Sequence, residues 1–337
     1  MPERIKKLAD WLNNQLSAKC EPVPITNDAS FRRYFRVNIN GEHYIAMDAP
    51  PDKENCHPYV DIANQLVGAG LNAPKVMASD FEQGFLLISD LGSQLYLPAL
   101  NASTAEKLYS EACDALLIMQ SLSADHLPPY DDELLHREMS LFTDWLLDKY
   151  LMHPLGFDLR RQLKTCFNVL ADNALSQPQV FVHRDYHSRN LMVTQKNSPG
   201  ILDFQDAVKG PFTYDLVSLL RDCYIAWPRE QVETWVKSYY QRISHIYSVE
   251  NMTEVTFLRW FDLMGIQRHL KASGIFARLY YRDNKKGYLK DIPRTLNYMV
   301  EVSENYLELK QLHSLIKEEI LPQFIKHTKK LFGTIEP

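Results

Sequence analysis

The spacing of apolar residues changes along the chain from a helical repeat to strand-like alternation. In residues 2–19 the apolar side chains recur every three or four positions, which predicts an amphipathic helix. Residues 34–48 are β-prone on both sides of Asn40-Gly41, a pair favoured in two-residue hairpin turns because both positions need a positive φ. We therefore predict an opening helix followed by an antiparallel β-hairpin.

Turn residues divide the next segment into one helix and two strands. Prolines precede a helical stretch over residues 59–68, and β-prone residues fill 75–79 and 85–89. We therefore predict that residues 1–90 form a small mixed domain in which a sheet carries one helix.

The chain is mainly helical after residue 90. Apolar residues recur at helical spacing in stretches that we predict to be helices: 103–122, 133–151, 158–175, 213–226, 230–247, 251–272 and 295–332. Three short strands interrupt them, at 180–183, 191–193 and 200–203. The pattern predicts an α+β protein with a larger helical domain over residues 91–337.

Composition narrows the function classes. The chain has 337 residues with 37 basic and 42 acidic side chains and a net charge of −5, so bulk attraction to nucleic acid or to an anionic membrane is not expected. Its five cysteines form no CxxC pair, and the longest purely aliphatic stretch runs only from Ala115 to Met119. We expect a cytoplasmic protein, a monomer or weak dimer, that binds neither nucleic acid nor membrane.

One segment departs from this acidic balance. Residues 262–294 hold eight basic and three acidic side chains, so the segment carries +5 and the remainder of the chain −10. Such a region favours an anionic small-molecule partner and disfavours a polycation such as an aminoglycoside. A solvated basic helix face is the alternative interpretation.

The chemistry-bearing residues gather between two predicted strands, in the segment VFVHRDYHSRNLMV. Asp185 and Asn190 have the D-x-x-x-x-N spacing of a phosphoryl-transfer loop, in which the Asp orients or deprotonates the attacking hydroxyl and the Asn binds a divalent cation. Asp203 follows Asn190 by thirteen residues, where such enzymes carry a second metal-binding carboxylate. The three residues together predict phosphoryl transfer.

This segment resembles the Brenner motif of the aminoglycoside phosphotransferase and choline kinase family, whose members phosphorylate small molecules. The resemblance implies a protein-kinase-like fold of two lobes, with a five-stranded antiparallel sheet in a small mixed N-terminal lobe and a larger helical C-terminal lobe. It also implies ATP as co-substrate, Asp185 as the catalytic residue, and Mg²⁺ bound by Asn190 and Asp203. His187 is typical of the small-molecule branch of the fold.

Residues 86–92 resemble the hinge of that family, which receives the adenine through backbone groups. In this resemblance Ile88 is the gatekeeper, and Ser89, Asp90 and Leu91 line the base. The expected nucleotide site therefore begins where the last predicted strand of the small domain ends.

Three further segments resemble a narrower group, the cell-wall amino-sugar kinases: DASFRRYFR at 28–36, AMDAPP at 46–51 and LRDCY at 220–224. These kinases phosphorylate the anomeric hydroxyl of N-acetylmuramate and N-acetylglucosamine in peptidoglycan recycling. The resemblance implies a sugar pocket lined by a set of polar side chains: His187, Arg221, Asp222 and Tyr224, with Arg268, His269 and Lys271 nearby. For Arg221, an ion pair with a neighbouring carboxylate is the alternative.

The nucleotide-binding part departs from the protein-kinase pattern. Met47 stands where a phosphate-binding lysine is expected, and the loop before the hairpin contains no glycine. We expect Arg32 and Arg33 to supply phosphate contacts instead, with Ser30 beside them. The missing lysine leaves a kinase-like scaffold as an alternative function, and an aminoglycoside- or choline-type phosphotransferase is another.

Two residues beside the catalytic loop are expected to act through its backbone. His183 suits a structural role, with a hydrogen bond that braces the loop. Asp215 precedes an apolar helix, where it either braces the catalytic loop or caps the helix.

Overall fold

The computed structural model describes a chain that divides into two compact units. The described residues are 3–17, 19–27, 31–39, 41–244 and 252–333. The first unit comprises residues 1–122 and 189–207, and the second comprises 123–188 and 208–337. Residues 91–122 thus group with the N-terminal part, while the assignment of functional domains to 1–90 and 91–337 stays a prediction.

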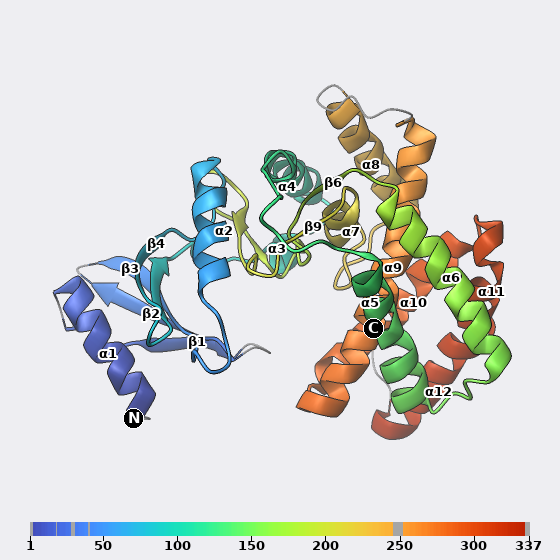
Figure 1. Cartoon of the computed structure of the whole chain (residues 1–337), viewed down its shortest axis with the longest axis horizontal. Coiled ribbons are helices and arrows are strands. Elements are labelled where there is room, and N and C mark those ends of the chain that lie inside the picture. Colours follow the sequence, from blue (N-terminus) through green and yellow to red (C-terminus); the bar gives the residue numbers. More distant parts are fainter. Residues whose placement is uncertain (1–2, 18, 28–30, 40, 245–251, 334–337) are drawn as a thin grey trace. The chain divides into compact units, whose positions relative to one another are not determined.

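A five-stranded antiparallel sheet forms the centre of the first unit (Figure 1). Its strands lie in the order β1-β2-β3-β5-β4. They are β1 (Val23–Asn27), β2 (Arg33–Ile39), β3 (Glu42–Asp48), β4 (Val76–Asp80) and β5 (Phe85–Ser89). The predicted hairpin is confirmed, because Ile39 pairs with Glu42 across a two-residue turn in which Gly41 has φ +86°. Asn40 lies outside the described residues.

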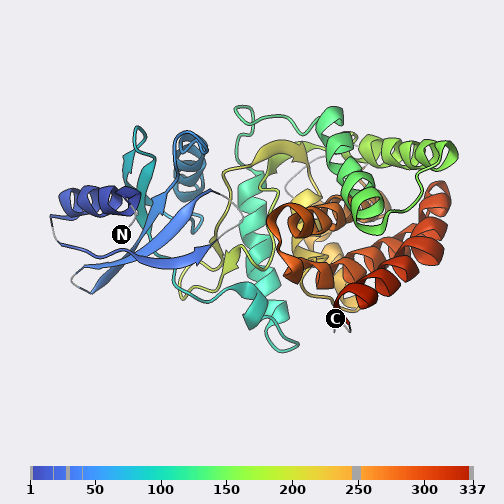
Figure 2. The same cartoon turned by 90° about the horizontal axis from the view of Figure 1, so that it is seen from below.

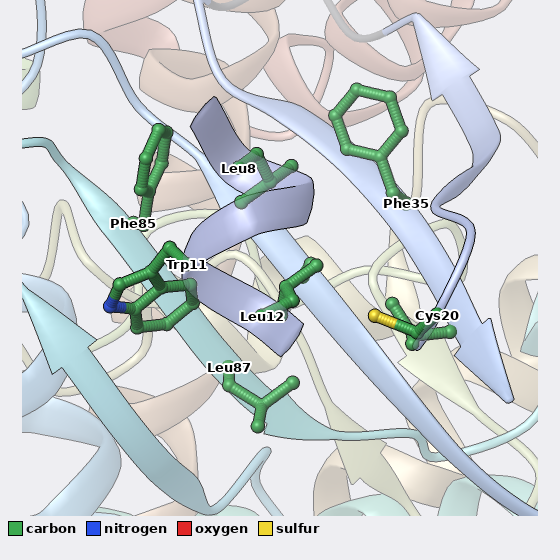
Figure 3. Close-up of a cluster of buried hydrophobic side chains, with 9 residues drawn as sticks. Leu8, Trp11, Leu12, Cys20, Phe35, Phe85 and Leu87 are labelled. Atoms are coloured by element: carbon green, nitrogen blue, oxygen red, sulfur yellow. The ribbon is translucent and has the colours of Figure 1, made fainter. Parts of the chain in front are cut away.

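Helix α1 (Glu3–Leu16) covers part of this sheet and confirms the opening amphipathic helix. Its apolar face presents Leu8, Trp11 and Leu12, which pack with sheet residues such as Phe35 and Phe85 (Figure 3). Burying each such side chain contributes about 1.5–3 kcal/mol. The apolar side chains on one face of the strands are therefore buried against α1, and this burial fixes the register of the strands.

The remaining elements of the first unit include α2, which contacts β4, and the two short strands on either side of the segment before Asp203. The full set is α2 (His57–Gly68), α3 (Tyr96–Ala99), α4 (Ala105–Gln120), β7 (Leu191–Met192) and β8 (Gly200–Ile201). The ring of Tyr59 on α2 lies 4.8 Å from the ring of Phe204, which is fully buried. Helix α2 thereby anchors the residue that follows Asp203.

The second unit is a helical bundle with one two-stranded sheet, formed by β6 (Gln179–Val182) and β9 (Val208–Pro211). Its helical elements are α5 (Asp132–Leu141), the π-helix η1 (Phe142–Leu151), α6 (Phe157–Leu175), α7 (Tyr214–Leu220), α8 (Arg229–Ser244), α9 (Glu254–Asp283), η2 (Lys286–Asp291), α10 (Ile292–Ser303), η3 (Leu307–Leu309), α11 (Lys310–Ser314), the π-helix η4 (Leu315–Ile320) and α12 (Leu321–Phe332). The long helix α9 packs against α5, η1, α6, α7 and α10 and forms the axis of the unit (Figures 1 and 2).

Several predicted boundaries were wrong. The helix expected over 213–226 ends at Leu220, the one over 251–272 continues to Asp283, and the stretch 295–332 is broken into shorter helices. Strand β9 was missed because Gly210 and Pro211 weaken any local strand signal, and it exists through its pairing with β6. Within the described residues, no helix is long and apolar enough to span a bilayer.

Gly274 allows α9 to lie directly against the junction of α5 and η1. A Cβ atom at this position would lie 2.2 Å from the backbone carbon of Leu141 and 2.6 Å from the backbone nitrogen of Phe142. Backbone atoms cannot withdraw as the end of a flexible side chain can. The two helices are therefore in contact at a point where only glycine fits.

Replacing Gly274 with alanine is expected to destabilise the protein by roughly 2–3 kcal/mol, because the added methyl group forces α9 away from Leu141. Thermal unfolding followed by circular dichroism measures the loss as a lower Tm. Gly68→Ala is the matched control, because a Cβ at Gly68 meets nothing within 4 Å. An unchanged Tm for Gly274→Ala would show that the helices tolerate a wider separation.

Candidate active site

The loop that carries Asp185 follows β6 in the second unit and is braced by a buried carboxylate. Asp215, at the start of α7, accepts hydrogen bonds from the backbone N–H of His183 at 2.6 Å and of Arg184 at 3.0 Å. Thr213 occupies the N-cap position of α7 and its side chain makes no cap bond. The bracing role of Asp215 is thus confirmed over the capping alternative. Burial raises its pKa to about 7, although the two backbone donors oppose the rise.

His183 supports the same loop from inside. Its ring is fully buried, and its Nδ1 accepts a hydrogen bond from the backbone N–H of Asp185 at 3.2 Å, which confirms the structural role predicted for it. Between these residues Arg184 has φ +76°, a left-handed conformation that is costly for a side chain with a Cβ. The hydrogen bonds to Asp215 and His183 offset this strain and hold the backbone at Asp185 in place.

A buried ionic network lies beside the loop. Glu138 on α5 is paired with Arg184 and, at 2.9 Å, with the ammonium group of Lys271 on α9, and Tyr130 donates its hydroxyl to the same carboxylate. Lys271 also donates to the hydroxyl oxygen of Tyr214 at 2.9 Å. Burial opposes ionisation of Glu138, but the charges of Lys271 and Arg184 outweigh it and lower the pKa of Glu138.

The same cations act on Asp185. Burial by itself raises the pKa of the Asp185 carboxyl, but the positive charges of Lys271, His187 and Arg268 outweigh this effect and the net shift is downward. Asp185 is therefore an ionised acceptor at neutral pH. An ionised carboxylate is the form that orients a hydroxyl group and takes its proton.

A second carboxylate, Asp222, ties the end of the loop to the segment after α7. It accepts hydrogen bonds from the backbone N–H of Ser188 at 2.9 Å, from the Ser188 hydroxyl, and from the backbone N–H of Tyr224 at 3.0 Å. The ring of Tyr224 lies 5.3 Å from the ring of His187. Two predicted sugar-binding residues, His187 and Tyr224, are thus adjacent, while the carboxylate of Asp222 is engaged by the loop.

Arg221 and His269 are buried and have protein partners. Arg221 forms an ion pair with Asp262 at 2.9 Å, which confirms the alternative of a neighbouring carboxylate. The Nε2 of His269 lies 3.0 Å from the backbone oxygen of Arg221. Burial lowers the pKa of His269 to about 3, so the ring is neutral and donates this bond through Nε2–H. Lys271, as described above, is also engaged. Contact of these residues with a sugar stays a prediction.

In the first unit, Asn190 and Asp203 lie together as the motif predicts. The Nδ2 of Asn190 is 3.4 Å from an oxygen of Asp203, and Gln205 donates to the other oxygen of Asp203 at 2.8 Å. Asp203 has φ +63°. Asn190 carries an amide oxygen and Asp203 a carboxylate, and oxygen donors are what Mg²⁺ requires. The residues present fit a magnesium ion.

The predicted phosphate-binding arginines are held by acidic residues of their own unit. Arg33 on β2 is paired with Asp48, which is fully buried, and Arg32 is paired with Glu54 at 2.8 Å. Met47 lies in the buried middle of the sheet. Ser30 lies outside the described residues. The structure thus separates Arg32 and Arg33 onto different partners, and their contact with phosphate stays a prediction.

The predicted hinge follows β5. Ile88 is buried, and Ser89 exchanges two hydrogen bonds of 2.9 Å with the backbone of Lys75. The carboxylate of Asp90 is paired with Arg36 at 2.6 Å and accepts the backbone N–H of Gly92 at 2.8 Å. Leu91 is half-buried. These bonds fix the backbone of the segment where adenine is expected to bind.

Sequence reasoning missed the carboxylates that hold the site together. Glu138 and Asp48 are distant in sequence from the residues they pair with, and Glu138 lies in an ordinary amphipathic helix. No local signal distinguishes either from an exposed acid. Their function depends on contacts that only the folded chain brings together.

A known family matches more than half of the chain. Residues 21–252 match the family model described as "Phosphotransferase enzyme family". The matched range includes Asp185, Asn190 and Asp203, and it ends near the start of α9.

Curated relatives are similar over nearly the whole chain. A protein from Pseudomonas putida named N-acetylmuramate/N-acetylglucosamine kinase is 44% identical over 94% of this chain and 98% of its own length. A protein of the same name from Neisseria meningitidis is 42% identical over 94% of this chain and 96% of its own.

Solved structures are similar in fold. ADP-bound aminoglycoside phosphotransferase APH(2'')-Ib matches with a TM-score of 0.59 at 16% identity, covering 90% of this chain and 99% of that one. Choline kinase LicA from Streptococcus pneumoniae matches with a TM-score of 0.60 at 12% identity, covering 89% of this chain and all of that one. These likenesses confirm the predicted kinase-like α+β fold.

Replacing Lys271 with methionine is expected to move the acidic limb of the pH–rate profile to higher pH. The substitution removes the charge that contributes most to lowering the pKa of Asp185, so the carboxyl of Asp185 keeps its proton up to a higher pH. The pH dependence of kcat for phosphoryl transfer measures the shift. Lys271→Arg keeps the charge and should restore the profile, and Lys290→Met, at an exposed lysine, should leave it unchanged. An unmoved limb in Lys271→Met would contradict the electrostatic coupling.

Proposed function

The chain belongs to the phosphotransferase enzyme family, and we propose that it transfers the γ-phosphate of ATP to the anomeric hydroxyl of N-acetylmuramate or N-acetylglucosamine. The observation that carries the sugar assignment is the high identity to kinases of that name over nearly the full length of both chains. The observation that carries the chemistry is the ionised, braced Asp185.

Asp185 acts on the acceptor. Its carboxylate orients the anomeric hydroxyl and accepts its proton, while the sugar oxygen forms a bond to the γ-phosphorus and the bond to the β–γ bridging oxygen breaks, which releases ADP. Anomeric hydroxyls are more acidic than ordinary alcohols, so the basicity required of Asp185 is modest. Positioning the hydroxyl then contributes most of the rate.

Asn190 and Asp203 are proposed to hold magnesium together with the nucleotide phosphates. When bound, Mg²⁺ neutralises phosphate charge that would otherwise repel the attacking oxygen. Gln205 keeps one oxygen of Asp203 oriented, and Phe204 is fixed by its contact with Tyr59. The backbone of Asp203 is therefore supported on both sides of the metal-binding carboxylate.

The nucleotide is proposed to bind along the end of β5, with adenine at Ile88, Ser89, Asp90 and Leu91. Arg32 and Arg33 are proposed to reach the phosphates, which requires each to share its charge with Glu54 or Asp48. Met47 is buried, so it supplies apolar surface in place of the charge that a lysine would bring. Ser30, outside the described residues, is part of the same proposal.

His187 and Tyr224 are proposed to line the sugar site. Their rings meet edge to face, and Phe276 on α9 continues the row, 5.9 Å from Tyr224. Aromatic faces suit the apolar faces of a sugar ring. Arg221, Asp222, His269 and Lys271 are proposed to act near this surface through the loop and helix that they hold.

The other candidate functions have weaker support. The structures of aminoglycoside and choline kinases are at most 16% identical to this chain in the comparisons above, which is evidence of fold alone. An inactive scaffold has no need for an ionised Asp185 held by two buried carboxylates. We further propose a cytoplasmic role in cell-wall recycling, since ATP is the co-substrate and the five cysteines are free.

The direct test is an acceptor panel. The purified protein is incubated with ATP, Mg²⁺ and each sugar, and ³¹P NMR identifies the product. A sugar 1-phosphate is expected from N-acetylmuramate or N-acetylglucosamine. A clear preference for kanamycin or choline would overturn the substrate class, and a phosphate on another hydroxyl would overturn the anomeric assignment.

Replacing Asp185 with asparagine is expected to lower kcat by about two orders of magnitude or more, because the amide cannot accept the proton. The affinity for ATP, measured by calorimetry, should change little. Asp148→Asn, at an exposed aspartate, is the control. Full turnover in Asp185→Asn would show that another group serves the acceptor.

Replacing Asn190 or Asp203 with alanine is expected to raise the magnesium concentration needed for half-maximal rate by about tenfold or more, since each change removes an oxygen ligand. A magnesium titration of the initial rate measures it. Asp172→Ala, at an exposed aspartate on α6, should keep the wild-type curve. Unchanged titrations in both active-site variants would contradict the metal-binding roles.

A further inference from the structure

Arg268 is a buried cation that the protein leaves without a carboxylate partner. Its residue is only 5% exposed, and its one hydrogen bond among the described residues is a weak one, from Nη1 to the sulfur of Cys223 at 3.5 Å. Its Nε–H is buried and has no acceptor in the described part of the chain. Burial opposes the charge, yet the nearby carboxylates of Asp185 and Asp222 help to keep the pKa of Arg268 raised.

Other cations near Arg268 have carboxylate partners. Arg184 and Lys271 share Glu138, Arg221 is paired with Asp262, and Arg294 is paired with Asp291. Each of these charges has a carboxylate oxygen close enough for an ion pair. Arg268 has no such oxygen among the described residues. Arg278 of the same segment also lacks an ion pair there, but it is only half-buried, whereas Arg268 is almost fully buried.

An incompletely partnered buried guanidinium destabilises the free protein, because it has lost hydration without gaining equivalent bonds. A residue that costs stability and could be replaced by an apolar side chain is a candidate for function. The chemistry that would satisfy Arg268 is specific. A carboxylate accepts two parallel hydrogen bonds from one guanidinium, including the Nε–H that has no acceptor here.

Arg268 is joined to the sugar-binding surface by a short stretch of chain. Cys223, which it contacts, lies between Asp222 and Tyr224. Asp222 holds Ser188 at the end of the catalytic loop, and the ring of Tyr224 meets that of His187. The unsatisfied cation is therefore linked through Cys223 to the residues that we assign to the sugar.

We propose that Arg268 recognises the lactyl carboxylate of N-acetylmuramate and so sets the preference of the enzyme between its two sugars. The assignment rests on the proposed function, since it presumes an amino-sugar acceptor. N-acetylglucosamine lacks the lactyl group and leaves Arg268 as it is in the free protein. A phosphate group is the other anion that a guanidinium could bind here, and the experiment separates the two.

The test compares wild-type enzyme with Arg268→Gln on three acceptors: N-acetylmuramate, its lactyl methyl ester and N-acetylglucosamine. In the wild type we expect kcat/KM for N-acetylmuramate to exceed that for the other two by about tenfold. In Arg268→Gln the ratio of kcat/KM for N-acetylmuramate to that for each of the other two acceptors should fall to about one, whatever change all three acceptors share through Asp185. Lys290→Gln, which removes an exposed positive charge of the same segment, should keep the advantage.

The other outcomes each overturn the inference. An equal fall for all three acceptors would assign Arg268 to phosphate binding or to the support of Asp185, and a rise in KM for ATP would identify phosphate as the anion. An unchanged preference for N-acetylmuramate would show that another residue binds the lactyl carboxylate. If wild-type enzyme phosphorylates none of the three, the proposed function fails first.

Thermal unfolding separates recognition from structural support. Because the charge of Arg268 lacks a close partner, Arg268→Gln or Arg268→Met should have a Tm equal to or above that of the wild type. N-acetylmuramate should raise the Tm of the wild type more than the methyl ester does, and the difference should vanish in both variants. A lower Tm in both variants, with equal losses of activity on all three acceptors, would mean that Arg268 is a structural residue.

Discussion

Burial of charge along α9 is the constraint on which the second unit depends. Helix α9 brings Arg268 and Lys271 into the interior, where a charge without a partner is costly. Glu138 meets Lys271 from α5, and the same carboxylate holds Arg184 in the catalytic loop. The close approach at Gly274 keeps α5 and α9 near enough for this shared ion pair. The packing of α5 against α9 and the position of the loop that carries Asp185 therefore depend on each other.

Much of the fold was predictable because its signals are local. The hairpin at Gly41 follows from turn chemistry, and the proximity of Asn190 to Asp203 agrees with the motif on which the proposed roles of Asp185, Asn190 and Asp203 rest. Strand β9 was not predictable, because its residues are poor strand formers that become a strand only against β6. Such a strand forms because it pairs with residues that are distant in sequence, and a short stretch of sequence contains no information on that pairing.

The site residues divide in the same way. His183 was correctly expected to brace the loop, since a buried imidazole beside a turn seeks backbone partners. The carboxylates of Glu138 and Asp48 carried no local signal, although each pairs with two cations. In the first unit, Asp48 pairs with Arg4 and Arg33 from two different elements. An acid of this kind is recognised only after the chain is folded.

The left-handed backbone at Arg184 places two demands on one position. The turn favours glycine, which adopts a positive φ without strain, whereas the ion pair with Glu138 needs a long cationic side chain. Glycine would satisfy the turn and arginine satisfies the ion pair, and other residues at this position would satisfy neither demand. A lineage that drifts from arginine to glycine there would have to change Glu138 as well, so the two sites should evolve as a pair.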